Sequence, residues 1–270
     1  MSDRRRVVSL VPSSTETLLA LGADVVACTR FCEQPDLRHV GGTKNPDISA
    51  IIGLDPDVVV LDREENRRED HDALVEAGIT VFVSDVRTVD DATEVVGLLA
   101  AVAGLETPPP SRPEAAAGAA RRTVFVPIWR RPWMTIGPNT YGASLLRHLG
   151  IDLVPTADGQ DGAGGQNGGD GDGDYPSVEL EDVASRRPDL VLVPSEPYEF
   201  RPDHLTELAE AFVDGTGIVP VDGQDLFWWG MRTPAAVRRL AVALAPSTTS
   251  AAVDPVAPDP SAPDPAAADD

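Results

Sequence analysis

The sequence predicts an α/β protein built from two similar halves, and three observations indicate this. Short apolar runs alternate with amphipathic stretches along most of the chain, which is typical of parallel β-α units. Two runs, PDVVVL at 56–61 and PDLVLV at 188–193, are continuous and mostly β-branched or aliphatic, as expected for strands buried on both faces of a sheet. A glutamate follows each Pro-Asp pair at the same offset, Glu64 in one half and Glu196 in the other.

The first half predicts four strands, over 6–11, 24–28, 58–61 and 79–83, with a loop over 31–47. Ser13 is predicted to cap a helix that ends at Gly22, with Glu16 at the capping-box position. Asn66 is predicted to cap a helix that ends at Gly78. A short helix is expected over 48–53 and a longer one over 88–103, where apolar residues recur on one face.

The second half repeats this plan. Strands are expected over 123–126, 151–154, 190–193 and 218–221, and helices over 178–185, 202–212 and 233–245. Asn139 is predicted to cap a further helix that ends at Gly150. Ligands bind such sheets at the carboxyl ends of the strands, which here carry residues 11–13, 126–133, 193–200 and 221–229.

Three segments lack a core pattern. The proline-rich stretch 107–113 cannot continue a helix and, with the alanines that follow, predicts a hinge; the alternative is a helix over 114–121. The Gly/Asp/Gln-rich insertion 158–174 and the tail 246–270 are expected to be disordered. Asp170, Asp172 and Asp174 resemble a calcium loop, but the glycine and glutamate that complete one are missing, so we favour a solvated loop.

Composition limits the function. The 270 residues carry 22 Lys+Arg against 44 Asp+Glu, a net charge of −22, which argues against nucleic-acid binding. Lys44 is the only lysine, and such acid-rich surfaces suit a very salty, halophilic cytoplasm, although a generally acidic protein is the simpler alternative. Cys28 and Cys32 are expected to be reduced structural thiols rather than metal ligands. The N-terminus does not read as a signal peptide, so we expect a cytoplasmic protein, or an extracytoplasmic one if it serves an importer.

All four tryptophans lie in two of these strand-end segments: Trp129 and Trp133 in one, Trp228 and Trp229 in the other. Their Arg, Pro, Gly and Asp neighbours are loop residues, so the group suggests flat surfaces for a large planar ligand, with core packing as the explanation for about half of them. Enzyme signatures such as a Walker loop or H-E-x-x-H are missing. A hydrolase built on Glu64 and Glu196 is disfavoured, because we expect the two groups to lie far apart on separate lobes.

These features together resemble the cobalamin-binding proteins of ABC importers, in the helical-backbone metal-receptor group (class III periplasmic-binding-protein fold). The blocks that carry the resemblance are RRVVSLVPSSTETLLALG at 5–22, VGGTKNPDISAIIGLDPDVVV at 40–60, EENR at 64–67, WRRPWMTIGPNTY at 129–141, YPSVELEDVASRRPDLVLVPSEPYEF at 175–200 and VDGQDLFWWGMRT at 221–233.

The resemblance implies two parallel-sheet α/β lobes joined by a single long connecting helix, with a ligand cleft between the lobes. It implies an N-terminal lobe over 5–87, a connecting helix and hinge over 88–121 and a C-terminal lobe over 122–245. One exposed glutamate per lobe would dock on a permease: Glu64 and Glu196, with Glu65, Glu69 and Glu199 as runners-up. Lys44 and Asp62 stand where cobalamin binders carry tryptophans, and prolines shorten the connecting helix. The residues expected to bind ligand are Phe31, Trp129, Trp133, Tyr198, Asp225, Trp228, Trp229 and Arg232.

The leading hypothesis is a non-enzymatic solute-binding protein that captures cobalamin or a related metal chelate. Its expected partners are a small-molecule ligand (a corrinoid, haem or siderophore) and, if it serves uptake, an ABC permease; no catalytic cofactor is expected. The alternatives are a cytosolic carrier without a permease and an enzyme with Asp225 or Glu196 as its acid–base group.

Overall fold

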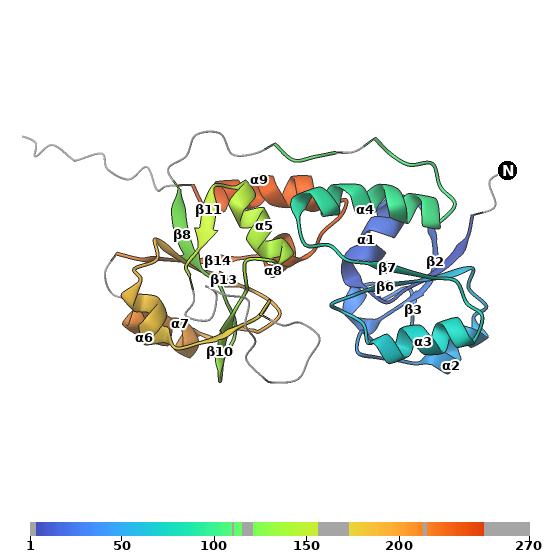
Figure 1. The fold of residues 1–270 in the computed structure, drawn as a ribbon, viewed down its shortest axis with the longest axis horizontal. Helices are drawn as coiled ribbons and strands as arrows, with labels where there is room; N and C mark the ends of the chain where they lie inside the picture. The colour runs from blue at the N-terminus through green and yellow to red at the C-terminus, as the bar shows by residue number, and fades with distance from the viewer. Residues whose placement is uncertain (1–3, 110, 115–120, 156–172, 213–214, 246–270) are drawn as a thin grey trace, which may run out of the picture.

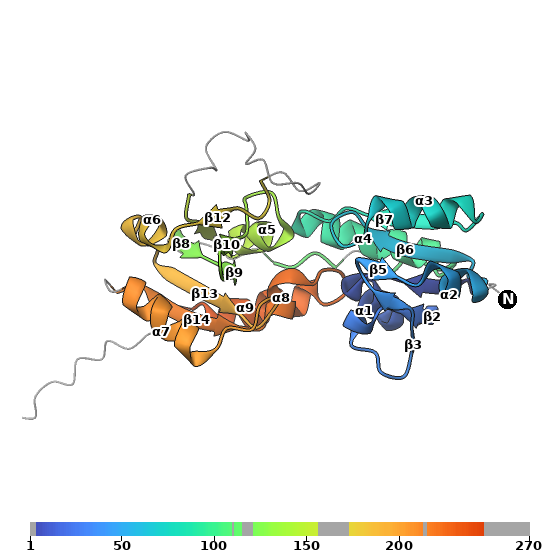
Figure 2. The ribbon, with the colours of Figure 1, turned by 90° about the horizontal axis from the view of Figure 1, so that it is seen from below.

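A computed structural model describes residues 4–109, 111–114, 121–155, 173–212 and 215–245. The chain forms two parallel-sheet lobes that lie side by side along the long axis of the molecule (Figures 1 and 2). The N-terminal sheet has the strand order β3-β2-β1-β6-β7, and the C-terminal sheet has the order β11-β8-β13-β14. The predicted α/β class with two parallel-sheet lobes is confirmed.

The N-terminal lobe contains the first seven strands. They are β1 (Arg6–Ser9), β2 (Asp24–Cys28), β3 (Arg38–His39), β4 (Gly41–Gly42), β5 (Asn45–Pro46), β6 (Val58–Asp62) and β7 (Val81–Ser84). Its helices are α1 (Pro12–Ala20), the 3-10 turn η1 (Arg30–Cys32), α2 (Ile48–Gly53), α3 (Arg68–Glu76) and α4 (Val89–Val102). The segment 31–47, expected to be a loop, therefore holds a 3-10 turn, an edge strand and the small β4–β5 hairpin.

The C-terminal lobe has its own sheet and a second, antiparallel one. Its strands are β8 (Arg122–Phe125), β9 (Pro127–Trp129), β10 (Trp133–Thr135), β11 (Ile151–Leu153), β12 (Ser177–Val178), β13 (Leu190–Pro194) and β14 (Gly217–Val221). Its helices are α5 (Tyr141–His148), α6 (Leu180–Ser185), α7 (Pro202–Ala211), α8 (Gly223–Phe227) and α9 (Thr233–Ala243). Strands β12, β10 and β9 pair in the antiparallel sheet, which the sequence analysis missed because each has only two or three residues.

Strand alternation divides the core into layers. Along β6, Val58 and Val60 face the cluster that contains α1 and α4, whereas Val59 and Leu61 face α2 and α3. The C-terminal sheet is likewise covered by α5 and α9 on one face and by α6 and α7 on the other (Figure 1). The cluster on the α1/α4 side continues without a break into the α5/α9 side of the other lobe. The two lobes therefore share one apolar core.

Helix α4 lies at the junction of the lobes, in agreement with the helix predicted over 88–103. Thr88 caps it in a capping box with Asp91, and the helix contacts α1 in one lobe and α5 and α9 in the other. After α4 the chain turns back along it, so that Arg112 forms an ion pair of 2.7 Å with Asp90 at the start of the helix. Residues 110 and 115–120, where the alternative helix over 114–121 falls, lie outside the described part of the chain.

Three of the predicted helix caps are wrong. Helix α1 begins at Pro12 with Val11 as N-cap, which places Ser13 inside the first turn. The Asn66 side chain instead accepts from the Asp62 amide and donates to the Thr43 carbonyl, and α3 starts two residues later. The cap of α5 is Thr140 rather than Asn139. For Ser13 and Asn66, the polar side chain forms a hydrogen bond with a residue that is distant in the sequence, so it does not cap the helix that follows it.

The insertion was expected to be disordered throughout, and this is wrong for its last residue. Asp174 is buried and its carboxylate forms an ion pair of 2.9 Å with Arg87. Residues 156–172, which include Asp170 and Asp172, and the tail 246–270 lie outside the described part. Among the described helices, none combines the length and apolar character that a bilayer crossing requires.

Candidate functional site

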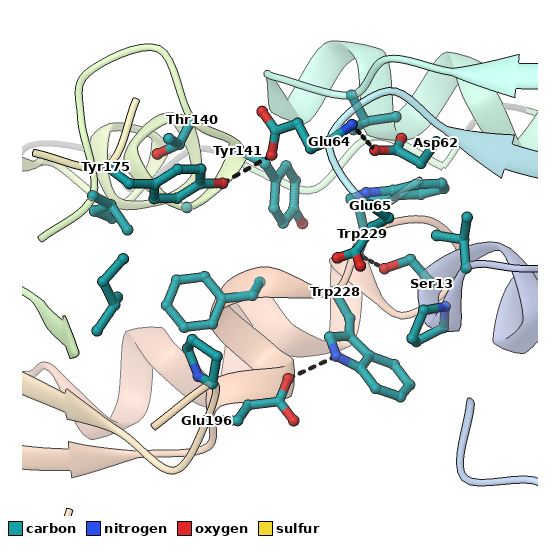
Figure 3. Close-up of a pocket in the computed structure, with 18 of the residues that line it drawn as sticks. Ser13, Asp62, Glu64, Glu65, Thr140, Tyr141, Tyr175, Glu196, Trp228 and Trp229 are labelled. Atoms are coloured by element: carbon teal, nitrogen blue, oxygen red, sulfur yellow. Dashed lines mark hydrogen bonds between the residues drawn. The ribbon is translucent and has the colours of Figure 1, made fainter. Parts of the chain in front are cut away.

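A cavity of about 440 Å³ lies between the lobes, where the carboxyl ends of both parallel sheets meet (Figure 3). This volume falls within the range of small-molecule sites. The carboxyl ends of the strands therefore form the walls of the cavity, at the edge of the sheets where the sequence predicts ligand binding. From the N-terminal lobe the lining residues are Val11, Pro12, Ser13, Asp62, Glu64, Glu65 and Val86. From the C-terminal lobe they are Ile128, Trp129, Met134, Ile136, Thr140, Tyr141, Gly142, Tyr175, Glu196, Pro197, Phe227, Trp228 and Trp229.

The C-terminal wall is aromatic. Trp129, Trp228 and Trp229 line the cavity, together with Tyr141 and Phe227. Trp229 is buried, whereas Trp129 keeps 45% of its surface exposed and so offers a free ring face to a ligand. Flat ring surfaces on one wall suit a broad, planar or amphipathic molecule.

The N-terminal wall carries three carboxyl groups at the end of β6 and just after it: Asp62, Glu64 and Glu65. Asp62 is buried and accepts hydrogen bonds from Ser84 Oγ at 2.8 Å and from the Glu64 amide at 2.9 Å. Desolvation nevertheless raises the pKa of Asp62 to about 6. Desolvation within the cleft, and then the neighbouring Asp62 carboxylate, raise the pKa of Glu65 to about 7. This wall is therefore polar and anionic, with protonation states that change near neutral pH.

Glu196 brings a fourth carboxyl group from the opposite lobe. Its Oε1 accepts a hydrogen bond of 2.7 Å from Trp228 Nε1 (Figure 3). Desolvation raises the pKa of Glu196 although this hydrogen bond acts in the opposite direction, and the Glu33 and Asp222 carboxylates raise it further. Glu64 and Glu196 were expected to lie far apart on separate lobes; the carboxyl ends of the two sheets face each other, so the two glutamates line one cavity from opposite lobes.

Helix α1 and the segment after α8 close the floor of the cavity. The Trp229 amide donates to Ser13 Oγ at 3.3 Å, and the Met231 amide donates to Thr17 Oγ1 at 3.2 Å. Between them, Gly230 has φ +102°, and a Cβ at this position would lie 2.1 Å from Thr17 Oγ1. This close approach of backbone to helix requires glycine.

Two contacts join the lobes on the other side of the cavity. Tyr175 Oη donates to Glu64 Oε2 at 2.8 Å (Figure 3). The residue before it, Asp174, pairs with Arg87, which also contacts Asp85 at 2.9 Å. The backbone carbonyl of Asp174 accepts from the Gly137 amide at 2.6 Å, which ties this segment to the C-terminal lobe. We call the contacts of Asp174 and Tyr175 with Arg87 and Glu64 the interlobe clasp.

Several predicted ligand residues lie outside the cavity lining. Trp133 stacks on Phe200 with ring centroids 5.9 Å apart, whereas Tyr198 packs edge-on against the exposed ring of Trp129 at 5.1 Å. Phe31 lies on η1 with 49% of its surface exposed and the Arg30 guanidinium 4.7 Å from its ring centroid.

Two other residues expected to bind ligand, Asp225 and Arg232, are engaged in ion pairs. Asp225 is buried and its Oδ2 accepts from Arg239 Nε at 2.6 Å. Arg232 forms an ion pair of 2.9 Å with Glu16 of α1, which adds to the contacts between the lobes, and its guanidinium lies 5.2 Å from the Trp228 ring centroid. Both side chains therefore stabilise the C-terminal wall of the cavity through these ion pairs.

Some lining residues that were not among the predicted ligand residues follow recognisable sequence features. Asp62 ends the buried strand β6 and Glu65 lies three residues later, at the sheet edge where ligands bind. Tyr141 begins a capped helix, and its hydroxyl is 3.0 Å from Thr233 Oγ1. Tyr175 follows the low-complexity insertion, and no sequence pattern indicates that it reaches the other lobe.

The described residues hold no group of three or more His, Cys, Asp and Glu arranged to bind a metal ion. Cys28 and Cys32 are free, buried thiols, and Thr15 Oγ1 donates to Cys32 Sγ at 3.2 Å. Hydrogen bonding from Cys28 lowers the pKa of Cys32 to about 6, whereas the same pairing raises the pKa of Cys28.

Residues 7–108 match the family model described as periplasmic binding protein. The vitamin B12-binding protein of Salmonella typhimurium (strain LT2) is 24% identical over 207 residues, which cover 70% of this chain and 71% of that protein. The periplasmic vitamin B12-binding protein BtuF of Vibrio cholerae superposes with a TM-score of 0.66 at 18% identity, over 89% of this chain and 96% of that one. The chain has the periplasmic-binding-protein fold.

This fold is shared by receptors with different ligands. A periplasmic heme-binding protein from Pseudomonas aeruginosa superposes with a TM-score of 0.70 at 18% identity, over 90% of this chain and 94% of that one. The predicted resemblance to the cobalamin-binding receptor group is confirmed, and the named relatives are binding proteins rather than enzymes. At these identities, the choice of ligand depends on the cavity of this chain.

Proposed function

We propose that this protein is a solute-binding receptor that captures a corrinoid such as cobalamin, or a related metal chelate, between its lobes. The observation that carries the proposal is the interlobe cavity, with three tryptophans on one wall and carboxyl groups at both ends. A flat chelate would lie against Trp129 and Trp228, while its polar substituents face Glu64, Glu65 and Glu196. The names of the vitamin B12-binding relatives support the same ligand class.

Binding would involve a small closure of the lobes. The apolar core that continues from α1 and α4 into α5 and α9 opposes a large hinge rotation, because opening it would expose buried side chains to water. The contacts of the interlobe clasp are polar and not part of this apolar core, and they would make or break as the lobes close.

The receptor would deliver its ligand to an ABC permease, and the periplasmic receptors with this fold support an extracytoplasmic site of action. The alternative is a cytosolic carrier of the same ligand. Cell fractionation, together with the mass of the purified native chain, distinguishes the two.

The test of ligand capture is calorimetric titration with cyanocobalamin, followed by chromatography of the recovered ligand. We expect saturable binding and unchanged ligand. Trp129→Ala should weaken binding by about tenfold, because an exposed ring face is lost, whereas Trp133→Ala, which removes a ring outside the cavity, should retain most of the affinity. Absence of saturable binding by cyanocobalamin and by other metal chelates would contradict the proposal.

Recovery of a chemically altered ligand would favour the enzyme alternative. The acid–base group would then be Glu196, which lines the cavity, rather than Asp225, whose carboxylate is paired with Arg239. Glu196→Gln would have to abolish turnover in that case.

Permease docking by Glu64 and Glu196 is a separate prediction, tested by reversing both charges and measuring uptake and binding. Uptake lost with binding intact would support docking. Both carboxyl groups line the cavity, so the double variant could lose ligand binding as well as uptake. That result would favour permease docking by Glu69 and Glu199, the exposed runners-up outside the cavity lining.

A further inference from the structure

The Asp, Glu, Lys and Arg residues that line the cavity, in the described part of the chain, are all acidic. Asp62, Glu64, Glu65 and Glu196 contribute carboxyl groups from both lobes, and within the described part of the chain no lysine or arginine lines the cavity with them. Glu33 and Asp222 lie near Glu196 and add negative charge at that end. A ligand therefore meets acidic groups on two opposing sides.

Three cations that contact residues of the cavity lining already have partners. Arg87 contacts Asp85 and Asp174, each at 2.9 Å, and lies 3.8 Å from Glu64. Arg232 is paired with Glu16, and Lys44 donates to the backbone carbonyl of Glu64. No described cation projects into the cavity to receive a carboxylate from a ligand.

This arrangement has a direct consequence for the ligand. A ligand carboxylate would sit among like charges in a partly desolvated space, where repulsion is stronger than in bulk water. Amide N–H groups or a net positive charge would instead be stabilised by the same oxygen atoms. Haem carries two propionate groups, whereas the corrin ring of cobalamin carries amide substituents.

We propose that the acidic cavity selects planar chelates with amide or cationic substituents and rejects those with carboxylates, and that Glu65 and Glu196 are the main determinants. This inference rests on the proposed receptor function and narrows its ligand class. It predicts that this protein binds haem poorly, unlike haem receptors of the same fold. The fold alone does not predict this difference in ligand. Glu65 and Glu196 line the cavity from opposite lobes, whereas the Asp62 carboxylate is buried and accepts hydrogen bonds from Ser84 and the Glu64 amide, and Glu64 accepts one from Tyr175.

The experiment compares matched ligands at pH 7 and fixed ionic strength, with the full-length protein. Cyanocobalamin is compared with its monocarboxylic acid, in which one amide is replaced by a carboxylate, with aquacobalamin, which differs by one positive charge, and with haemin. We expect aquacobalamin to bind at least as tightly as cyanocobalamin, the monocarboxylic acid about tenfold more weakly, and haemin more weakly still.

Two charge-matched variants assign the effect to the cavity. Glu65→Gln/Glu196→Gln should reduce the preference for cyanocobalamin over its monocarboxylic acid to about threefold or less. Glu76→Gln/Glu210→Gln removes the same charge from exposed helix positions of the two lobes and should leave the preference unchanged. Thermal unfolding of each variant verifies that the chain is folded.

Equal affinity for cyanocobalamin and its monocarboxylic acid, tighter binding of haemin, or an unchanged preference in the cavity variant would overturn the inference. If the wild-type protein binds no corrinoid, the corrinoid function fails instead. The selection rule is then tested with two water-soluble porphyrins, one with cationic pyridinium and one with sulfonate substituents. Binding of only the cationic porphyrin supports the rule, and binding of the sulfonate equally well or better refutes it.

Discussion

Glu64 and Glu196 occupy the same offset after equivalent strands, yet their side chains have different partners. Glu64 accepts a hydrogen bond from Tyr175 of the other lobe, and Glu196 accepts one from Trp228 of its own lobe. The equal offset accounts for their shared position at the strand ends. The difference arises because each partner comes from a distant part of the chain, 111 residues away for Glu64 and 32 for Glu196.

Gly230 is expected to be the glycine most sensitive to substitution at the junction of the lobes. Gly230→Ala should destabilise the protein by about 2–4 kcal/mol, because the new Cβ would overlap Thr17 Oγ1 at a backbone φ of +102°. Gly150→Ala is the matched control, since its φ is +77° with no atom within 4 Å, and should cost only about 1–2 kcal/mol. Urea unfolding measures both, and equal losses would show that the contact with α1 is unimportant.

At the scale of elements, the apolar pattern predicted the helices better than their capping residues. The alternation along β6 and the one-sided apolar face of α4 are local properties of the chain, and both elements form where expected. Ser13 and Asn66 failed as caps because each side chain bonds to a residue that is distant in sequence, Trp229 and Thr43 respectively. Short elements such as β10 and β12 depend on pairing across the chain, which a periodic pattern of two or three residues cannot indicate.

The interlobe clasp should control how long a ligand is retained. Arg87→Met removes the ion pair with Asp174 and weakens the support of Tyr175, so we expect ligand dissociation to accelerate about three- to tenfold, as measured by stopped-flow displacement. Arg63→Met is the control, because Arg63 pairs with the partly exposed Asp85 on the surface of the N-terminal lobe and not with the clasp residue Asp174. The prediction is wrong if both variants release ligand at the wild-type rate.

For the whole molecule, one continuous core and a polar cavity have opposite effects on stability. The core buries aliphatic side chains from both lobes, which favours a single cooperative unit. The cavity holds carboxyl groups whose ionised forms are poorly solvated, and these oppose folding at high pH. The carboxyl groups of the cavity should therefore contribute a decrease in stability as the pH rises.

Asp62 allows this pH dependence to be measured. Its pKa is about 6 in the folded protein and about 4 when unfolded, so the folded state binds more protons between these values and stability falls as pH rises through this window. Asp62→Asn removes the titratable group. The difference between the free energies of unfolding of the variant and the wild type should therefore change in favour of the variant, by on the order of 2 kcal/mol from pH 4 to pH 8. Denaturation at several pH values checks this, and parallel profiles for the two proteins would exclude Asp62 as the source.

Much of this protein follows from local chemistry that can be read along the chain. Hydrophobic periodicity and strand-end composition place the α/β lobes, the aromatic segments and the glutamates after β6 and β13, since these features depend on neighbouring residues. The cavity itself depends on how two sheets face each other, which places Glu64 and Glu196 on the lining of one cavity and leaves Trp133 and Phe31 outside it. Tyr175, Arg87 and Asp174 meet only because the lobes dock through a shared core, and contacts over such chain separations leave no periodic trace in the sequence.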